Sequence, residues 1–129
     1  MLRLILTICC LVIPLTPAFA QATFDGGTIA QWSHVLRNDQ NKRMRLRAAS
    51  IILKAGPKAK GSVPALLECI QNEKDSRVRA KAAEALGQVG LSDPSVLPVL
   101  LKVMQTDADW VTRKLCIVAI GSLGPKAAS

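Results

Sequence analysis

The chain has 129 residues, a formal net charge of +8 and an apolar content of 50%. This length predicts one domain, and so high an apolar content argues against an intrinsically disordered chain. Aromatic residues make up only 3% and tyrosine is absent, which favours helices packed through small side chains over an aromatic-rich sheet sandwich.

The first 20 residues have the pattern of a signal peptide. Arg3 gives a basic start, an apolar run covers 4–15, and the segment ending at Ala20 has the small-x-small pattern that signal peptidase reads. We predict cleavage between Ala20 and Gln21, and therefore an exported protein, periplasmic or secreted. An uncleaved membrane anchor is the alternative, although the run is shorter than the roughly 20 residues of a membrane span and contains a proline.

The mature chain is expected to begin with a flexible leader over 21–27, followed by a repeat domain over 28–125 and a tail over 126–129. Removal of the signal peptide would leave Cys69 and Cys116 as the two remaining cysteines. Exported domains that depend on disulfides usually carry more cysteines. We therefore expect a fold that depends on its core, with Cys116 as a buried thiol and no disulfide or zinc site.

The repeat domain is similar to itself at one fixed offset, the signature of a solenoid. The offset from Arg45 to Arg79 is the same as that from Arg79 to Arg113, and it also relates Gly56, Gly90 and Gly124. We call this offset the repeat period. Apolar residues within each unit follow i, i+4, i+7, i+8 and i+11, which is one face of a helix. The pattern predicts six helices, over 28–37, 42–55, 62–71, 76–89, 95–105 and 109–123.

Signals at the helix ends agree with these bounds. Ser62 is a candidate N-cap residue. Gly56, Gly90 and Gly124 are predicted to end helices, because glycine can adopt the left-handed conformation of a helix C-cap. The expected fold is all-α, a superhelix of three helical hairpins.

The segment Asp75–Gly90 resembles the short HEAT-like repeat of bacteria, also called the phycobilisome-lyase type. The family pattern of Asp, Val-Arg, Ala-Ala and Ala-Leu-Gly is met by Asp75, Val78-Arg79, Ala82-Ala83 and Ala85-Leu86-Gly87. The third copy departs from it with Thr112 and with Cys116-Ile117. The resemblance implies a HEAT-like solenoid and a function in binding another macromolecule. Because this repeat serves many unrelated proteins, it does not identify a substrate or a bilin site.

The three arginines related by the repeat period, Arg45, Arg79 and Arg113, form a column of equivalent positions. Asn41, Asp75 and Asp109 each precede an arginine of this column by four positions. One interpretation is structural: the Asp or Asn caps the helix, and the arginine pairs with the cap of its own or the next repeat to form a ladder. The other is functional: the arginines face a groove and bind an anionic partner.

Basic residues gather at the starts of the repeated helices and form the candidate binding site. They are Arg43, Arg45, Arg47, Arg77, Arg79, Lys81 and Arg113. Such a stripe suits an acidic protein, with anionic lipid or polysaccharide as alternatives. Nucleic acid is disfavoured, because the protein is expected to be exported and has few aromatic residues for base stacking.

No catalytic residue, cofactor or metal site is predicted. His34 is the only histidine, so a histidine-rich metal site is excluded, and we assign it no ligand role. The main hypothesis is a non-catalytic protein-binding module of the bacterial envelope. The alternatives are a lyase-like enzyme or enzyme accessory, and a structural protein that associates with itself through the open ends of the solenoid, where the last copy leaves an apolar face to be covered.

Overall fold

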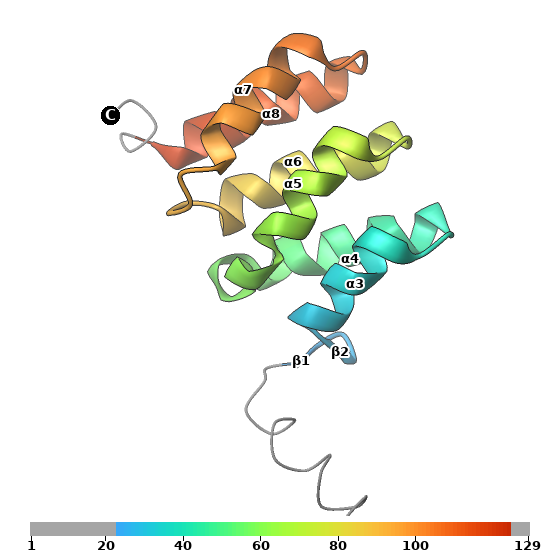
Figure 1. Ribbon diagram of the computed structural model, residues 1–129. Helices are drawn as coiled ribbons and strands as arrows, with labels where there is room; N and C mark the ends of the chain where they lie inside the picture. Colours follow the sequence, from blue (N-terminus) through green and yellow to red (C-terminus); the bar gives the residue numbers. More distant parts are fainter. Residues whose placement is uncertain (1–22, 125–129) are drawn as a thin grey trace, which may run out of the picture.

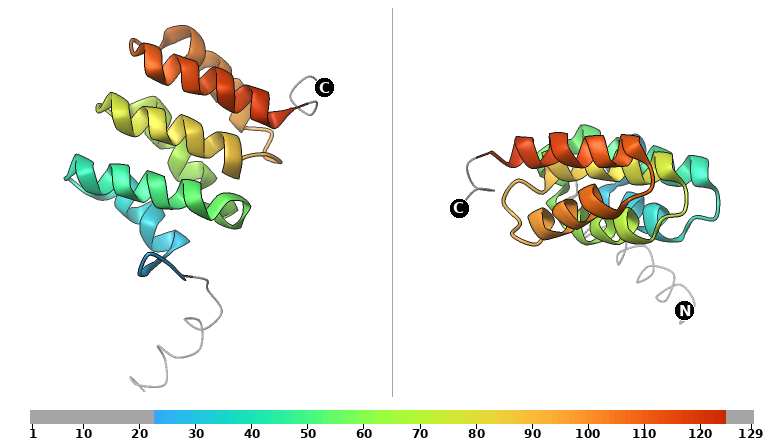
Figure 2. Two further views of the ribbon diagram at one scale, coloured as in Figure 1. Left: turned by 180° about the vertical axis from the view of Figure 1, so that it is seen from behind. Right: turned by 90° about the horizontal axis from the view of Figure 1, so that it is seen from above.

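The computed structural model describes residues 23–124, and this range contains six α-helices in three hairpins. The helices are α3 (Ile29–Asn38), α4 (Lys42–Ala55), α5 (Val63–Asn72), α6 (Ser76–Val89), α7 (Val96–Thr106) and α8 (Trp110–Leu123). The hairpins stack in a line (Figure 1). Seen from above, α4, α6 and α8 form one layer and α3, α5 and α7 the other (Figure 2). The predicted all-α solenoid is confirmed, and each helix begins and ends within one residue of its predicted bounds.

The α4, α6 and α8 layer begins each of its helices with the predicted cap. Asn41 Oδ1 accepts a hydrogen bond from the Arg43 N–H at 3.0 Å, and Asp75 Oδ1 accepts one from the Arg77 N–H at 2.9 Å. Asp109 caps α8 one position further along, where its Oδ2 accepts a hydrogen bond from the Thr112 N–H at 2.9 Å. Each cap satisfies a backbone donor that has no partner within its helix.

The helix stops are of two kinds. Gly56 and Gly124 have φ values of 59° and 61°, a backbone region that favours glycine. Gly90 was expected to be similar, but its φ is −92°. A side chain is excluded there for another reason, since a Cβ on Gly90 would lie 2.7 Å from Val96 Cγ2.

A 3-10 turn, η1 (Gly56–Ser62), links α4 to α5. The prediction of Ser62 as a side-chain cap is wrong. Its backbone is already helical, and its hydroxyl donates to the Ala59 carbonyl at 2.6 Å. The buried hydroxyl therefore closes the 3-10 turn instead of capping α5.

The core follows the repeat. Ala48, Ala82 and Cys116 are related by the repeat period, and all three are fully buried. Small side chains let neighbouring helices approach closely. At Gly87 the approach leaves no room for a side chain, because a Cβ there would lie 2.8 Å from the Ala119 Cα of α8. The helix α6 thus lies between α4 and α8.

The start of the described range differs from the expected flexible leader. The strands β1 (Thr23–Phe24) and β2 (Gly27–Thr28) form a small antiparallel hairpin, in which Asp25 has a φ of 50° and Gly26 a φ of 83°. Trp32 Nε1 donates to the Phe24 carbonyl at 2.7 Å. Residues 23–27 are therefore folded against α3 by contacts that a local reading of the sequence does not include.

The predicted signal peptide, its cleavage site and the tail over 126–129 lie outside the described residues. Among the helices of the described range, none has the length and apolar character needed to cross a membrane.

Candidate interaction surface

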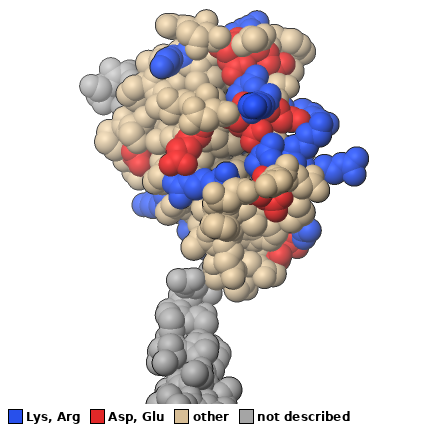
Figure 3. Space-filling model, turned by 45° about the vertical axis from the view of Figure 1, so that its right-hand side comes forward, with Lys and Arg blue, Asp and Glu red and all other residues tan. Residues whose placement is uncertain are grey.

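The predicted site residues lie along one edge of the stack, where the turns at 39–41, 73–75 and 107–109 lead into α4, α6 and α8. The space-filling view of this edge shows Lys and Arg side chains interleaved with Asp and Glu (Figure 3). The edge is therefore a surface of mixed charge. Which basic groups remain available depends on the pairing of each one.

Arg45 is committed to a contact between repeats. Its Nε and Nη2 donate to the two carboxylate oxygens of Glu73 at 2.7 and 2.9 Å, and its Nη1 donates to the Asp39 carbonyl at 2.7 Å. The Glu73 side chain is 8% exposed. Burial works against its ionisation, but the bonds from Arg45 and from the Asp75 N–H outweigh burial and lower the pKa of Glu73.

Arg79 repeats this arrangement one unit later. Its Nε and Nη2 donate to both oxygens of Asp107 at 2.8 and 3.0 Å, and its Nη1 donates to the Glu73 carbonyl at 3.0 Å. Burial of Asp107 is again outweighed by the arginine, which lowers the pKa of this carboxyl. Two successive junctions of the stack therefore hold the same bidentate ion pair.

Arg113, the third member of the column, has only part of this arrangement. Its Nη1 donates to the carbonyls of Asp107 and Ala108 at 2.7 and 3.1 Å, which matches the contacts of Arg79 in the repeat before it. Among residues 23–124, no carboxylate accepts a bond from its Nε and Nη2. The series of arginines thus ends at Arg113, whose Nη1 is bound by carbonyls while its Nε and Nη2 have no carboxylate partner among the described residues.

The predicted ladder exists, with a different acceptor. The arginine of each of the first two repeats pairs with a carboxylate of the next repeat. That carboxylate lies two positions before the N-cap residue and is not the cap itself. Asp39, Glu73 and Asp107 form this acidic column, again at the repeat period. The period contained this signal, but the column alternates between Asp and Glu and we did not identify it.

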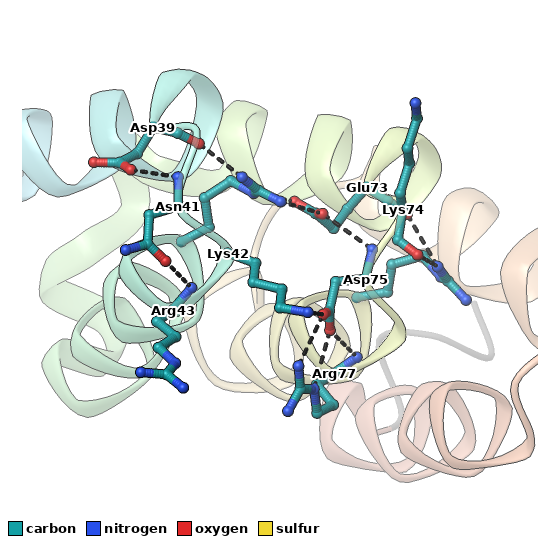
Figure 4. A network of polar contacts seen from close by, with 10 residues as sticks. Asp39, Asn41, Lys42, Arg43, Glu73, Lys74, Asp75 and Arg77 are labelled. Carbon is teal, nitrogen blue, oxygen red and sulfur yellow. Dashed lines mark hydrogen bonds and ion pairs between the residues drawn. The ribbon is translucent and has the colours of Figure 1, made fainter.

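The cap Asp75 binds two other cations. Arg77 Nη2 lies 3.0 Å and Lys42 Nζ 3.9 Å from Asp75 Oδ2. Figure 4 shows both side chains pointing at this carboxylate from two different helix starts. The hydrogen bond from Arg77 lowers the pKa of Asp75 to about 2. One carboxylate thus faces two basic groups, and positive charge is left over at this point.

The remaining predicted site residues differ in the partners that they bind. Arg47 pairs with Asp25 at 2.7 Å and lies over the Trp32 ring at 5.5 Å, and it thereby fastens the N-terminal hairpin. Lys81 pairs with Glu84 on its own helix at 2.8 Å. Arg43 is exposed and projects away from the network, with no ion pair among the described residues.

A groove of about 410 Å³ lies next to this edge, on the α4, α6 and α8 layer. Leu46, Val111 and Leu115 supply its apolar lining. Its charged lining residues are Arg77, Lys81, Glu84 and Asp109. The groove joins apolar surface to basic groups, which is the combination that an acidic amphipathic segment would need.

The groups considered for chemistry are apart from one another. His34 is exposed on α3, where Asn38 Nδ2 lies 3.1 Å from its Nδ1. Cys69 and Cys116 are free, and burial raises the pKa of their thiols to about 12 and about 11. Within the described part of the chain, no three His, Cys, Asp or Glu residues are grouped as metal ligands.

Comparison with known proteins gives one match. Residues 29–121 match the family model described as HEAT repeats. No curated protein matches the chain, and no solved structure matches it. The matched range begins with the first residue of α3 and ends two residues before the end of α8.

Proposed function

The chain belongs to the HEAT-repeat family, whose repeats are generally protein-interaction modules and not catalysts, and from this premise we propose that it binds an acidic protein partner without catalysis. The observation that carries this proposal is the groove on the α4, α6 and α8 layer. Its lining combines apolar side chains with the basic groups of Arg77 and Lys81, beside the acidic groups of Glu84 and Asp109.

The proposed contact residues divide into two groups by burial. Arg45 and Arg79 have side chains that are 18% and 16% exposed, and both bind carboxylate and carbonyl oxygens of the stack. They fix the spacing of the repeats. Arg77 is 66% exposed and Arg43 is exposed beside it at the next helix start, so these two are the basic groups that a partner reaches first.

The mixed charge of the edge favours a protein over a uniformly charged polymer. A lipid surface or an acidic polysaccharide presents charge of one sign, and it would meet Asp75, Glu84 and Asp109 as well as the basic groups. A folded protein can place acidic and basic groups opposite their complements, which gives specificity as well as attraction.

The proposed site of action is the cell envelope or the external medium. The support is the signal-peptide pattern of 1–20 in the sequence. Mass spectrometry of the protein isolated from the organism that makes it would then give a chain beginning at Gln21.

The binding proposal is tested by capture from an envelope extract. The baits are the chain 21–129, the same chain with R43E and R77E, and a control with K58E and K102E. Both variants change the charge equally, and the control residues are exposed and lie on η1 and α7, away from the groove. Circular dichroism first checks that all three baits have equal helicity.

The proposal expects a protein that is retained by the native and control baits, lost from the R43E and R77E bait, and released by salt because exposed charges are screened. Equal retention by all three baits would move the site away from this edge. Retention of lipid or polysaccharide without protein would replace the partner class.

A further inference from the structure

The last hairpin carries, in the same register, the glycine and the arginine by which α6 receives α8. At the inner junction, Gly87 admits the backbone of Ala119, and a Cβ at that glycine would lie 2.8 Å from the Ala119 Cα. Gly121 stands one repeat period later, on α8. A Cβ there would meet nothing within 4 Å. α8 therefore has a position at which another helix could approach closely, and no helix of the described range lies there.

The apolar surface around Gly121 shows the same contrast. Ala49 and Ala83 are fully buried in α4 and α6, whereas Ile117, at the same position of the third repeat, is 57% exposed. Val118 beside it is 54% exposed, and Trp110 at the start of α8 is 63% exposed. A position that is buried twice within the stack therefore becomes a large apolar group at its end.

Arg113 adds a requirement on charge. The carbonyls of Asp107 and Ala108 hold its Nη1 as in the repeat before it, and its other donors lack the carboxylate that Arg45 and Arg79 each bind. A neighbour that covered the apolar surface without a carboxylate at this point would bury an arginine that is half satisfied, which is costly.

These three features specify the neighbour. At the inner junction, the carboxylate of Asp107 lies two positions before the cap Asp109, and Ala119 follows Asp107 by twelve positions. A helix that fits α8 would carry an acidic residue two positions before its cap and a small residue about three turns later, as this spacing requires.

The N-terminal end of this chain does not supply that helix. Asp39 and Asn41 match the acid and the cap, but the residue twelve positions after Asp39 is Ile51, which is bulky and already buried, with 5% exposure. The hairpin of β1 and β2 is also fastened at that end by Arg47 and Asp25. A second copy stacked head to tail would have to displace it.

The geometry points to the face of Arg113, Ile117, Val118 and Gly121 as a second docking surface, which binds a helical hairpin of another protein with an acidic residue ahead of its helix. The occupant continues the stack as a fourth repeat would. This surface shares Arg113 with the basic edge but has no residue in common with the lining of the groove, and it does not depend on the proposed function of that edge.

The test adds such a hairpin to the full chain. The segment 91–124 spans one repeat period, and repeating it directly after Gly124 keeps the register. The copied Asp107 then lies where it can meet Arg113. Thermal and urea unfolding are measured for the original chain and the extended chain. In the extended chain they are also measured for three variants: the copied aspartate changed to Ala, R113M, and both changes together.

The expected result is a higher Tm for the extended chain and a coupling between Arg113 and the copied aspartate of about fivefold or more in the unfolding constant. The G121L variant should not destabilise the original chain, since a Cβ at Gly121 meets nothing within 4 Å, and it should remove the gain from the extension. An extension that unfolds independently, or one without that coupling, would overturn the proposal.

A separate measurement covers the other occupant. Sedimentation equilibrium of the unextended full chain is expected to show a monomer at micromolar concentration. Association that R113E or G121L abolishes would make a second copy of this chain the occupant, and it would overturn the assignment to another protein. Neither measurement uses an extract or changes Arg43 or Arg77, so failure here leaves the test of the proposed function intact.

Discussion

At the residue scale, Arg45 and Arg79 are structural, although they belong to the column that first indicated a binding site. Each guanidinium binds a carboxylate through two donors and a carbonyl through a third. The rigid fork of arginine suits such a planar acceptor, and lysine would lose the second bond. The remaining binding capacity lies in Arg43 and Arg77, whose side chains are exposed.

The contribution of the ladder can be measured at Glu73. We expect E73Q to lower the free energy of unfolding by about 1–3 kcal/mol, because it leaves the part-buried guanidinium of Arg45 without its counter-charge. The matched control is E68Q. Its pair with Arg37 is 58% and 38% exposed, so its loss should be within about 0.5 kcal/mol. Urea unfolding at pH 7 distinguishes the two variants, and equal losses would contradict a stabilising ladder.

The cap at Asp75 should make stability depend on pH in acid. Its pKa is lowered from 3.8 to about 2 in the folded chain, chiefly by Arg77. A lowered pKa means that the ionised form stabilises the fold. This contribution is complete above about pH 4 and is lost as the pH falls towards 2.

The measurement is urea unfolding from pH 6 to pH 2. In D75N the cap is kept, as by Asn41 in the first repeat, but the titrating group is gone. We therefore expect a shallower loss of stability for D75N than for the native chain. Parallel curves would show that Asp75 does not contribute to the acid transition.

At the scale of elements, two glycines at the same repeat position should respond in opposite ways. G87A would place a methyl group 2.8 Å from the Ala119 Cα, and overpacking of this kind costs about 1–3 kcal/mol. G121A meets nothing within 4 Å, so it should gain roughly 0.5 kcal/mol from helix propensity alone. Thermal unfolding of both variants decides the matter, and a loss in G121A would mean that this face of α8 is not open.

The helices were predictable because several local signals agree with the period. Cap residues, apolar spacing and glycine stops recur in every unit, so an error in one copy is corrected by the others. Where the chain departs from the period, prediction failed. The hairpin at 23–28 depends on Trp32 and Arg47, which lie 8 and 22 residues beyond their partners.

The site was predicted less well for a physical reason. The sequence states the charge of each position, but whether a charge is free depends on the distance between stacked helices. Arg45 and Glu73 are 28 residues apart and meet only because one repeat lies on the next. The basic columns looked alike in sequence, and burial separates Arg79 at 16% exposure from Arg77 at 66%.

At the scale of the whole molecule, stability should be distributed unevenly along the stack. The helix α6 packs between α4 and α8, whereas α8 has one neighbour in its layer within the described range. We expect amides around Ala82 in α6 to exchange with deuterium at least about tenfold more slowly than those around Val118 in α8, because the end repeat can open alone. Hydrogen exchange with mass spectrometry measures this, and equal protection would indicate a single cooperative unit.

The pairing of an arginine in one unit with a carboxylate in the next has a consequence for inheritance. A unit with neighbours on both sides pairs its carboxylate with the arginine of the unit before it. It pairs its arginine with the carboxylate of the unit after it. Recombination that duplicated or deleted a complete repeat unit would join Arg45 or Arg79 to the corresponding acid of its new neighbour. The chain can therefore lengthen or shorten by whole repeat periods without leaving a buried charge unpaired, whereas a change of any other length would separate the arginine from its acid.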